Sequence, residues 1–227
     1  MSIMEDDNDA FPNYTEKYPQ QALICSCPQI MPPVLNLDTK LILIMHRYET
    51  IRRTATAPLA TRCLTNHELY IHGYSDNCID LTNLIRDPTR RTLLLYPGET
   101  ARPLTHKLMS EDSRPVNLIV PDGSWRQAHR MAKRIPGLDQ AELVTLPEGG
   151  PDTQWNLRRE PKVGGLATFE AIARAYGILE SANVQEKLEQ FFHKTIEMNE
   201  KGEQGSFYTM RKQTIEAAAA AKKKNLH

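Results

Sequence analysis

A carboxylate, a glycine, a hydroxyl and an indole stand together in the sequence Asp122-Gly123-Ser124-Trp125. The apolar residues before them predict a buried strand, and residues 126–135 after them carry apolar side chains at helical spacing. Ser124 suits the N-cap of that helix, and Gly123 permits backbone conformations closed to most residues. In an open parallel sheet this turn would lie in the ligand-binding crevice beyond the carboxyl end of the strand. Asp122 could then act as an acid or base, or it could only complement the helix dipole.

The surrounding elements predict how this turn is positioned. Five apolar runs are typical of buried strands, at residues 41–45, 69–72, 92–96, 118–120 and 143–146. Helices are expected at 56–64 and near 100–110, and from residue 167 the apolar spacing becomes helical. Strands that alternate with helices indicate an α/β fold with a mostly parallel sheet and flanking helices. The loops that begin at residues 46, 95 and 121 should therefore gather at one edge of the sheet.

Composition excludes several classes of protein. The 227 residues carry 28 basic and 28 acidic side chains, so the chain is neither polybasic nor an acidic disordered segment. No apolar run is long enough to span a membrane, and the acidic start does not resemble a signal peptide, so we expect a cytoplasmic protein without a membrane partner. The four cysteines are irregularly spaced, which favours reduced thiols. Cys25 and Cys27 supply only two thiolates, and no metal site is expected.

Basic residues occur in clusters despite the neutral total. A basic face formed by such clusters could follow phosphates, although a solvated helix face is the more common explanation for any one cluster. The candidate phosphate-binding arginines are Arg52, Arg53, Arg126, Arg130, Arg158 and Arg159. A diglycine at 164–165 lets backbone approach a ligand closely. Neither a P-loop nor a dinucleotide-binding glycine pattern is present, so ATP and nicotinamide cofactors are not expected.

Several motifs in register resemble the DTW-domain family. Residues 121–128 are similar to its signature, with Ser124 where threonine is usual. His46-Arg47-Tyr48-Glu49 with residues 52–56, the Leu-Tyr-Pro turn at 95–97, and the segments 157–161 and 166–171 resemble its other elements. The resemblance covers roughly residues 23–180. Two departures are the absence of an early Cys-x-x-Cys, with residues such as Tyr14 and Lys17 in its place, and alanines at 55 and 167 where many relatives have asparagine and serine.

This resemblance implies a tRNA-uridine aminocarboxypropyltransferase. Such enzymes transfer the 3-amino-3-carboxypropyl group of S-adenosylmethionine (SAM) to N3 of a uridine and release methylthioadenosine. The family is related to the SPOUT class, which implies a C-terminal trefoil knot around the SAM site. Three units are expected: an N-terminal arm (1–22), a catalytic domain (23–200) and a helix-prone tail (201–227). Zinc is not expected, because only Cys25 and Cys27 of the knuckle remain.

The resemblance also implies roles for individual residues. Asp122 is the expected base, and Trp125 is expected to shape the pocket or to stack a ring. The expected SAM-binding residues are Leu95, Tyr96, Pro97, Gly123, Ser124, Leu166, Ala167, Thr168 and Glu170, with bracing of the loop as the alternative for the last two. The expected partner is tRNA and not DNA. A methyltransferase of the same fold, a non-catalytic RNA-binding module, a ribosomal RNA substrate and any oligomeric state stay open.

Overall fold

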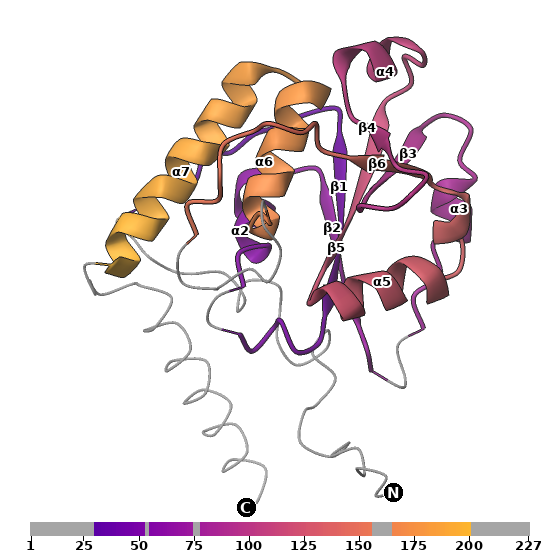
Figure 1. Cartoon of the computed structure of the whole chain (residues 1–227), viewed down its shortest axis with the longest axis horizontal. Coiled ribbons are helices and arrows are strands. Elements are labelled where there is room, and N and C mark those ends of the chain that lie inside the picture. Colours follow the sequence, from indigo (N-terminus) through magenta and orange to yellow (C-terminus); the bar gives the residue numbers. More distant parts are fainter. Residues whose placement is uncertain (1–29, 53–54, 75–77, 156–164, 201–227) are drawn as a thin grey trace, which may run out of the picture.

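The structure is a computed structural model that describes residues 30–52, 55–74, 78–155 and 165–200. Within these residues, six strands form one sheet in the order β2-β1-β5-β3-β6-β4 (Figure 1). The strands are β1 (Lys40–His46), β2 (His67–His72), β3 (Arg91–Leu95), β4 (Arg102–Pro103), β5 (Val116–Asp122) and β6 (Glu142–Thr145). Every pair of neighbouring strands is parallel. The predicted parallel α/β fold is therefore confirmed.

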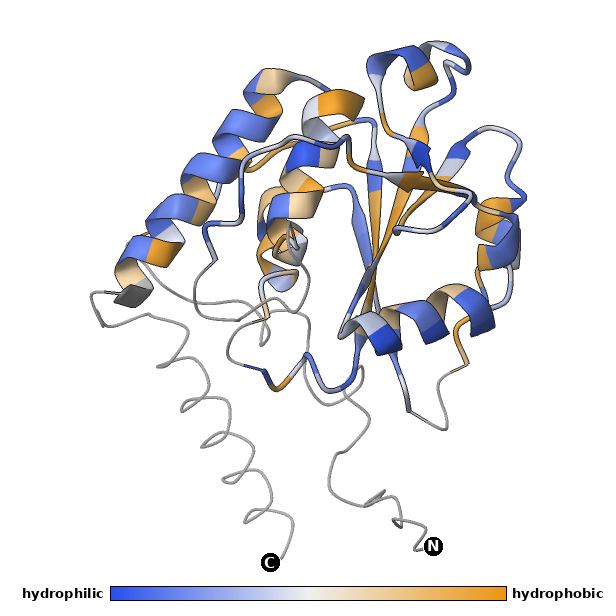
Figure 2. Cartoon of the chain, in the orientation of Figure 1, coloured by the Kyte–Doolittle hydropathy of each residue, from blue (hydrophilic) through white to orange (hydrophobic). Residues whose placement is uncertain are grey.

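The central strands are buried on both faces. Residues 41–45 of β1 have no exposed surface, and all seven residues of β5 are buried. Because both faces are covered, the middle of each strand, residues 41–45 and 118–120, is continuously apolar rather than alternating. Figure 2 shows the same contrast, with hydrophobic strands at the centre and hydrophilic outer helix faces.

Helices cover the two faces and create two apolar clusters. The first face carries α2 (Pro58–Cys63), α6 (Thr168–Leu179) and α7 (Ala182–Glu200), and the second carries α3 (Thr82–Ile85) and α5 (Trp125–Arg134) (Figure 1). The short helix α4 (His106–Ser110) follows β4, and η2 (Leu138–Gln140) contacts α3 and α5. The larger cluster contains the buried side chains of α6 and α7, and the smaller contains those of α5. No helix among the described residues is both long and apolar enough to cross a bilayer.

The five predicted strands are present, and their ends shift by a few residues at most. Three details differ from the prediction. The apolar pattern does not predict β4, whose two residues are both exposed and include a proline. The expected helix near 100–110 is limited to His106–Ser110. Asp122 is the last residue of β5 and not a turn residue. The predicted knot depends on a path through residues 156–164, outside the described residues, so it stays a prediction.

Candidate functional site

A cavity of about 710 Å³ lies at the carboxyl edge of the sheet. Its wall is formed by the loops after β3, β5 and β6 and by residues 165–168 at the start of α6. Parallel sheets bind ligands at this edge, and pockets for small molecules have volumes of about 300–1,000 Å³. Predicted site residues that line it are Leu95, Tyr96, Pro97, Asp122, Gly123, Ser124, Trp125, Leu166, Ala167 and Thr168. Of the three loops predicted to converge, those that begin at residues 95 and 121 line the cavity, and the loop that begins at residue 46 does not.

Asp122 is held at the point where β5 and α6 meet. Its side chain is only 3% exposed but belongs to the cavity wall. The Thr168 hydroxyl donates a hydrogen bond of 2.6 Å to Asp122 Oδ1. A hydroxyl that donates to a carboxylate at this distance forms a strong, charge-assisted bond. This contact orients the carboxylate and joins two segments that lie 46 residues apart in sequence.

The turn after Asp122 is rigid because both groups of a capping box are present. The Ser124 side chain caps α5 by accepting from the Gln127 amide, and Gln127 Oε1 accepts from the Ser124 amide at 2.8 Å. The predicted reason for glycine at 123 was wrong, because its φ angle is not positive. The reason is space: a Cβ atom there would lie 3.1 Å from the Gln127 side chain and 3.4 Å from His46 Cβ.

Aromatic side chains form one side of the cavity. The rings of Tyr96 and Trp125 are tilted, with centroids 6.5 Å apart. The Tyr96 hydroxyl lies 3.5 Å from His129 Nδ1, and burial raises the pKa of Tyr96. Tyr96 therefore carries a neutral phenol at physiological pH. This wall is suited to contact with a flat ring or an apolar chain.

Glu170 is not among the residues that line the cavity, and its role in SAM binding stays a prediction. Its buried carboxylate accepts from the amides of Gln154 and Ala167 at 2.8 and 2.9 Å and from the Thr153 hydroxyl. These contacts tie the loop after β6 to the first turn of α6. The alternative, that Glu170 braces the loop, fits the geometry.

Sequence reasoning missed two large side chains in the wall, Trp155 and Arg174. Arg174 donates to the Pro151 carbonyl at 2.6 Å, and Trp155 packs against Phe192 with ring centroids 5.6 Å apart. The position of Arg174 could have been predicted from helical spacing, because residues 168, 171 and 174 share one face of α6 and Thr168 was already a candidate. Trp155 carries no comparable sequence signal, since it belongs to an irregular connection.

The predicted RNA-binding arginines are only partly described. Arg126 lies in the cavity wall and is exposed, and Arg130 is exposed one turn later on α5. Arg52 is exposed and its Nε lies 3.4 Å from the buried Glu49 carboxylate. The other three, at 53, 158 and 159, lie outside the described residues.

No group of three or more histidine, cysteine or acidic side chains in the described ranges could hold a metal ion. Cys25 and Cys27 lie outside those ranges. Among the described cysteines, Cys63 is buried and Cys78 is exposed.

The fold and the cavity define an α/β protein with a cavity at the carboxyl edge of a parallel sheet. The model of the DTW domain matches residues 17–199, and the chain belongs to this family. The resemblance inferred from the motifs is therefore confirmed.

Curated relatives share the family match. A Drosophila melanogaster protein named tRNA-uridine aminocarboxypropyltransferase 2 is 27% identical over 174 residues, which cover 74% of this chain and 67% of the relative. The Mus musculus protein of the same name is 30% identical over 175 residues, 73% of this chain and 56% of the relative. The Arabidopsis thaliana tRNA-uridine aminocarboxypropyltransferase A is 26% identical over 204 residues, 78% and 77% of the two chains. The match thus spans little more than half the length of the mouse relative.

A solved structure is also similar to this chain. It is that of the SAM-dependent rRNA:acp-transferase Tsr3 from Vulcanisaeta distributa, at 24% sequence identity and a TM-score of 0.44. The match covers 71% of this chain and 79% of the other.

Proposed function

We propose that this protein transfers the 3-amino-3-carboxypropyl group of SAM to N3 of a uridine in tRNA and releases methylthioadenosine. The observation that carries the proposal is the cavity in which Asp122, Trp125 and Thr168 meet the loops after β3 and β6. The names of the relatives supply the reaction class.

The cavity suits SAM in size and in chemistry. Its wall combines apolar and aromatic groups for an adenosine with charged groups for the amino acid end. Arg126 and Arg174 are guanidinium groups in the wall that can bind a carboxylate, and Glu148 and Asp152 are acids that can bind an ammonium group. SAM supplies a sulfonium centre that makes the adjacent methylene carbon electrophilic.

Asp122 is the proposed base of the reaction. The proton on uridine N3 passes to its carboxylate as the bond from N3 to the methylene carbon forms. The carbon–sulfur bond breaks at the same time, and its electron pair stays on sulfur, so a neutral thioether leaves. Two bound molecules must be aligned for this displacement, and positioning can therefore supply much of the rate. The Thr168 hydroxyl is proposed to orient the base through its 2.6 Å hydrogen bond.

The test is to incubate unmodified tRNA with the purified protein and SAM and to analyse the nucleosides by mass spectrometry. We expect aminocarboxypropyluridine together with methylthioadenosine. Adenosylhomocysteine would instead identify a methyltransferase, and absence of SAM binding in calorimetry would identify a binding module. Ribosomal RNA is assayed as a substrate in parallel. A preference for ribosomal RNA would change the proposed substrate but not the proposed reaction.

Two substitutions test the assigned roles. Asp122→Asn should lower transfer by about 100-fold or more, the contribution typical of general base catalysis, while SAM still binds. Thr168→Val removes the hydroxyl and should lower the rate, whereas the matched variant Thr168→Ser keeps the hydroxyl and should retain most of the activity. Normal turnover of Asp122→Asn would remove the base assignment, and equal activity of the two Thr168 variants would remove the orienting role.

A further inference from the structure

The loop after β1 presents aromatic rings and a guanidinium group that the proposed reaction does not use. We propose that His46, Arg47 and Tyr48, called here the stacking loop, bind an unpaired RNA base adjacent to the uridine being modified. This inference rests on the proposed function, and it assigns to these side chains a role in recognising RNA.

The stacking loop lies directly beside the catalytic turn. β1 and β5 pair in parallel, and Met45 lies opposite Asp122 in the register. The chain therefore leaves β1 at His46 next to Gly123, and a Cβ atom on Gly123 would lie 3.4 Å from His46 Cβ. Neighbouring strands are about 4.8 Å apart. A base bound by the stacking loop can therefore belong to the nucleotide adjacent to the one whose uracil enters the cavity.

The rings of the stacking loop are held in place and remain accessible. Tyr48 is 44% exposed, although it is a large aromatic residue. The His46 and Tyr48 ring centroids are 5.2 Å apart, and the Tyr48 amide donates to His46 Nδ1 at 3.3 Å. The Arg47 guanidinium lies 4.9 Å from the Tyr48 ring centroid and donates to its hydroxyl at 3.1 Å. The ring is thus ordered before any partner binds, and this order lowers the entropy lost on binding.

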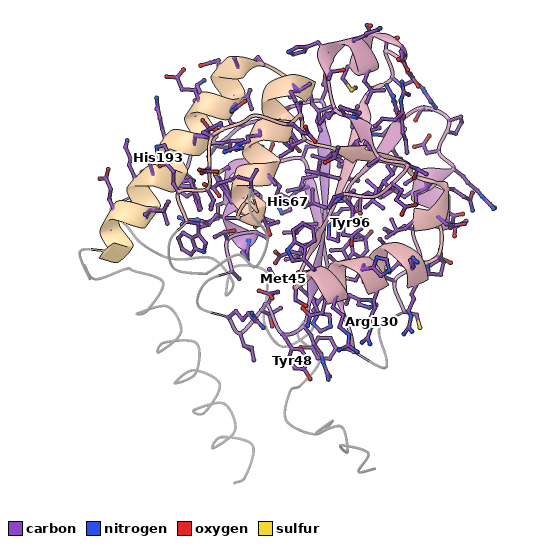
Figure 3. The ribbon with its side chains drawn as sticks, in the orientation of Figure 1. Met45, Tyr48, His67, Tyr96, Arg130 and His193 are labelled. Atoms are coloured by element: carbon purple, nitrogen blue, oxygen red, sulfur yellow. The ribbon has the colours of Figure 1, made fainter. Side chains whose placement is uncertain are left out.

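The charges near the stacking loop favour a phosphate backbone. The pKa of His46 is lowered to about 4, first by burial and then by charge interactions with His72, Arg47, Arg52 and Arg130. Figure 3 shows Tyr48 and Arg130 at the same end of the molecule, beyond Met45. Glu49, the acid in this loop, is buried and faces Arg52. The surface therefore combines cationic groups with an accessible ring.

This combination is the one by which proteins bind single-stranded nucleic acid. Bases stack on aromatic side chains while basic groups contact the phosphates. The proposed chemistry requires the same state of the RNA, because N3 of a base-paired uridine is engaged in the pair. An extruded uridine leaves its neighbour without a stacking partner, and Tyr48 can replace that partner.

The experiment compares Tyr48→Ala with two matched variants. Ile51→Ala removes a side chain of similar exposure, 45%, from the same loop without removing a ring. Tyr48→Phe keeps the ring and loses only the hydroxyl contact to Arg47. Binding is measured by fluorescence anisotropy with a labelled RNA hairpin that has uridine in its loop and with a fully paired duplex of equal length. SAM affinity is measured by calorimetry.

Tyr48→Ala should weaken binding of the hairpin by about 5- to 100-fold, the range for loss of one stacked base, and should raise its KM. Binding of the duplex and of SAM should change little. Ile51→Ala and Tyr48→Phe should bind the hairpin almost as the unaltered protein does. Unchanged hairpin binding by Tyr48→Ala would overturn the inference, and so would an equal loss for hairpin and duplex. If the unaltered protein transfers no group while Tyr48→Ala still loses hairpin binding, the proposed function fails and the stacking loop stands.

Discussion

Replacement of Glu170 tests whether one buried carboxylate holds two walls of the cavity together. Its carboxylate accepts from the Ala167 amide, the Gln154 amide and the Thr153 hydroxyl. Glu170→Gln keeps the shape of the side chain but removes the charge and turns an amide NH2 toward a donor. A hydrogen bond to a charged group contributes roughly 1.5–3 kcal/mol, and these three share one carboxylate, so we expect a loss of about 2–3 kcal/mol of unfolding free energy. For a domain of this size the melting temperature should fall by about 5–10 °C.

Urea denaturation and calorimetric titration with SAM measure the two consequences of this change. Both bonded segments line the cavity, so SAM affinity should fall together with stability. Glu186→Gln is the matched control, because that exposed side chain on α7 contacts only Gln190 among the described hydrogen bonds, and it should change neither quantity. An unchanged urea midpoint for Glu170→Gln would refute the bracing role. Weaker SAM binding at full stability would instead return Glu170 to the ligand-binding residues.

Three further predictions concern a cap, a histidine and a thiol. Ser124→Ala removes the N-cap of α5 and should cost about 1 kcal/mol in thermal unfolding, and an unchanged melting temperature would contradict the capping role. Burial and neighbouring positive charges lower the pKa of His46 from 6.5 to about 4, so the unfolded chain takes up a proton in this interval that the folded chain does not. Unfolding free energy should therefore fall as pH drops through that window, by about 1–2 kcal/mol after solvent screening, and His46→Asn should flatten this dependence in urea titrations. Burial raises the pKa of Cys63 to about 12, so alkylation followed by peptide mapping should label the exposed Cys78 in the folded protein and Cys63 only after unfolding. Comparable labelling of both thiols in the folded protein would contradict the burial.

The sheet could be predicted because its central strands are buried on both faces. Residues 41–45 and 118–120 are continuous apolar runs, and in an α/β domain such runs are typical of strands covered on both faces. β4 could not be predicted, because among the described strands it pairs with β6 alone and both of its residues are exposed. An exposed edge strand buries no apolar face, so its sequence carries no periodic signal. The order of the strands also depends on crossovers that apolar periodicity does not specify.

The site could be predicted where one motif holds both a functional group and its structural support. In residues 122–125, the strand end, the cap and the carboxylate are adjacent in sequence, so local rules specify most of the geometry. The contact from Thr168 to Asp122 joins segments 46 residues apart, and only the packing of α6 against the sheet creates it. Glu170 is two residues further along the same helix, yet its side chain bonds the loop instead of facing the cavity. Two residues along a helix correspond to about 200° of rotation. Thr168 therefore hydrogen-bonds the proposed base, whereas Glu170 hydrogen-bonds backbone amides on another side of the helix.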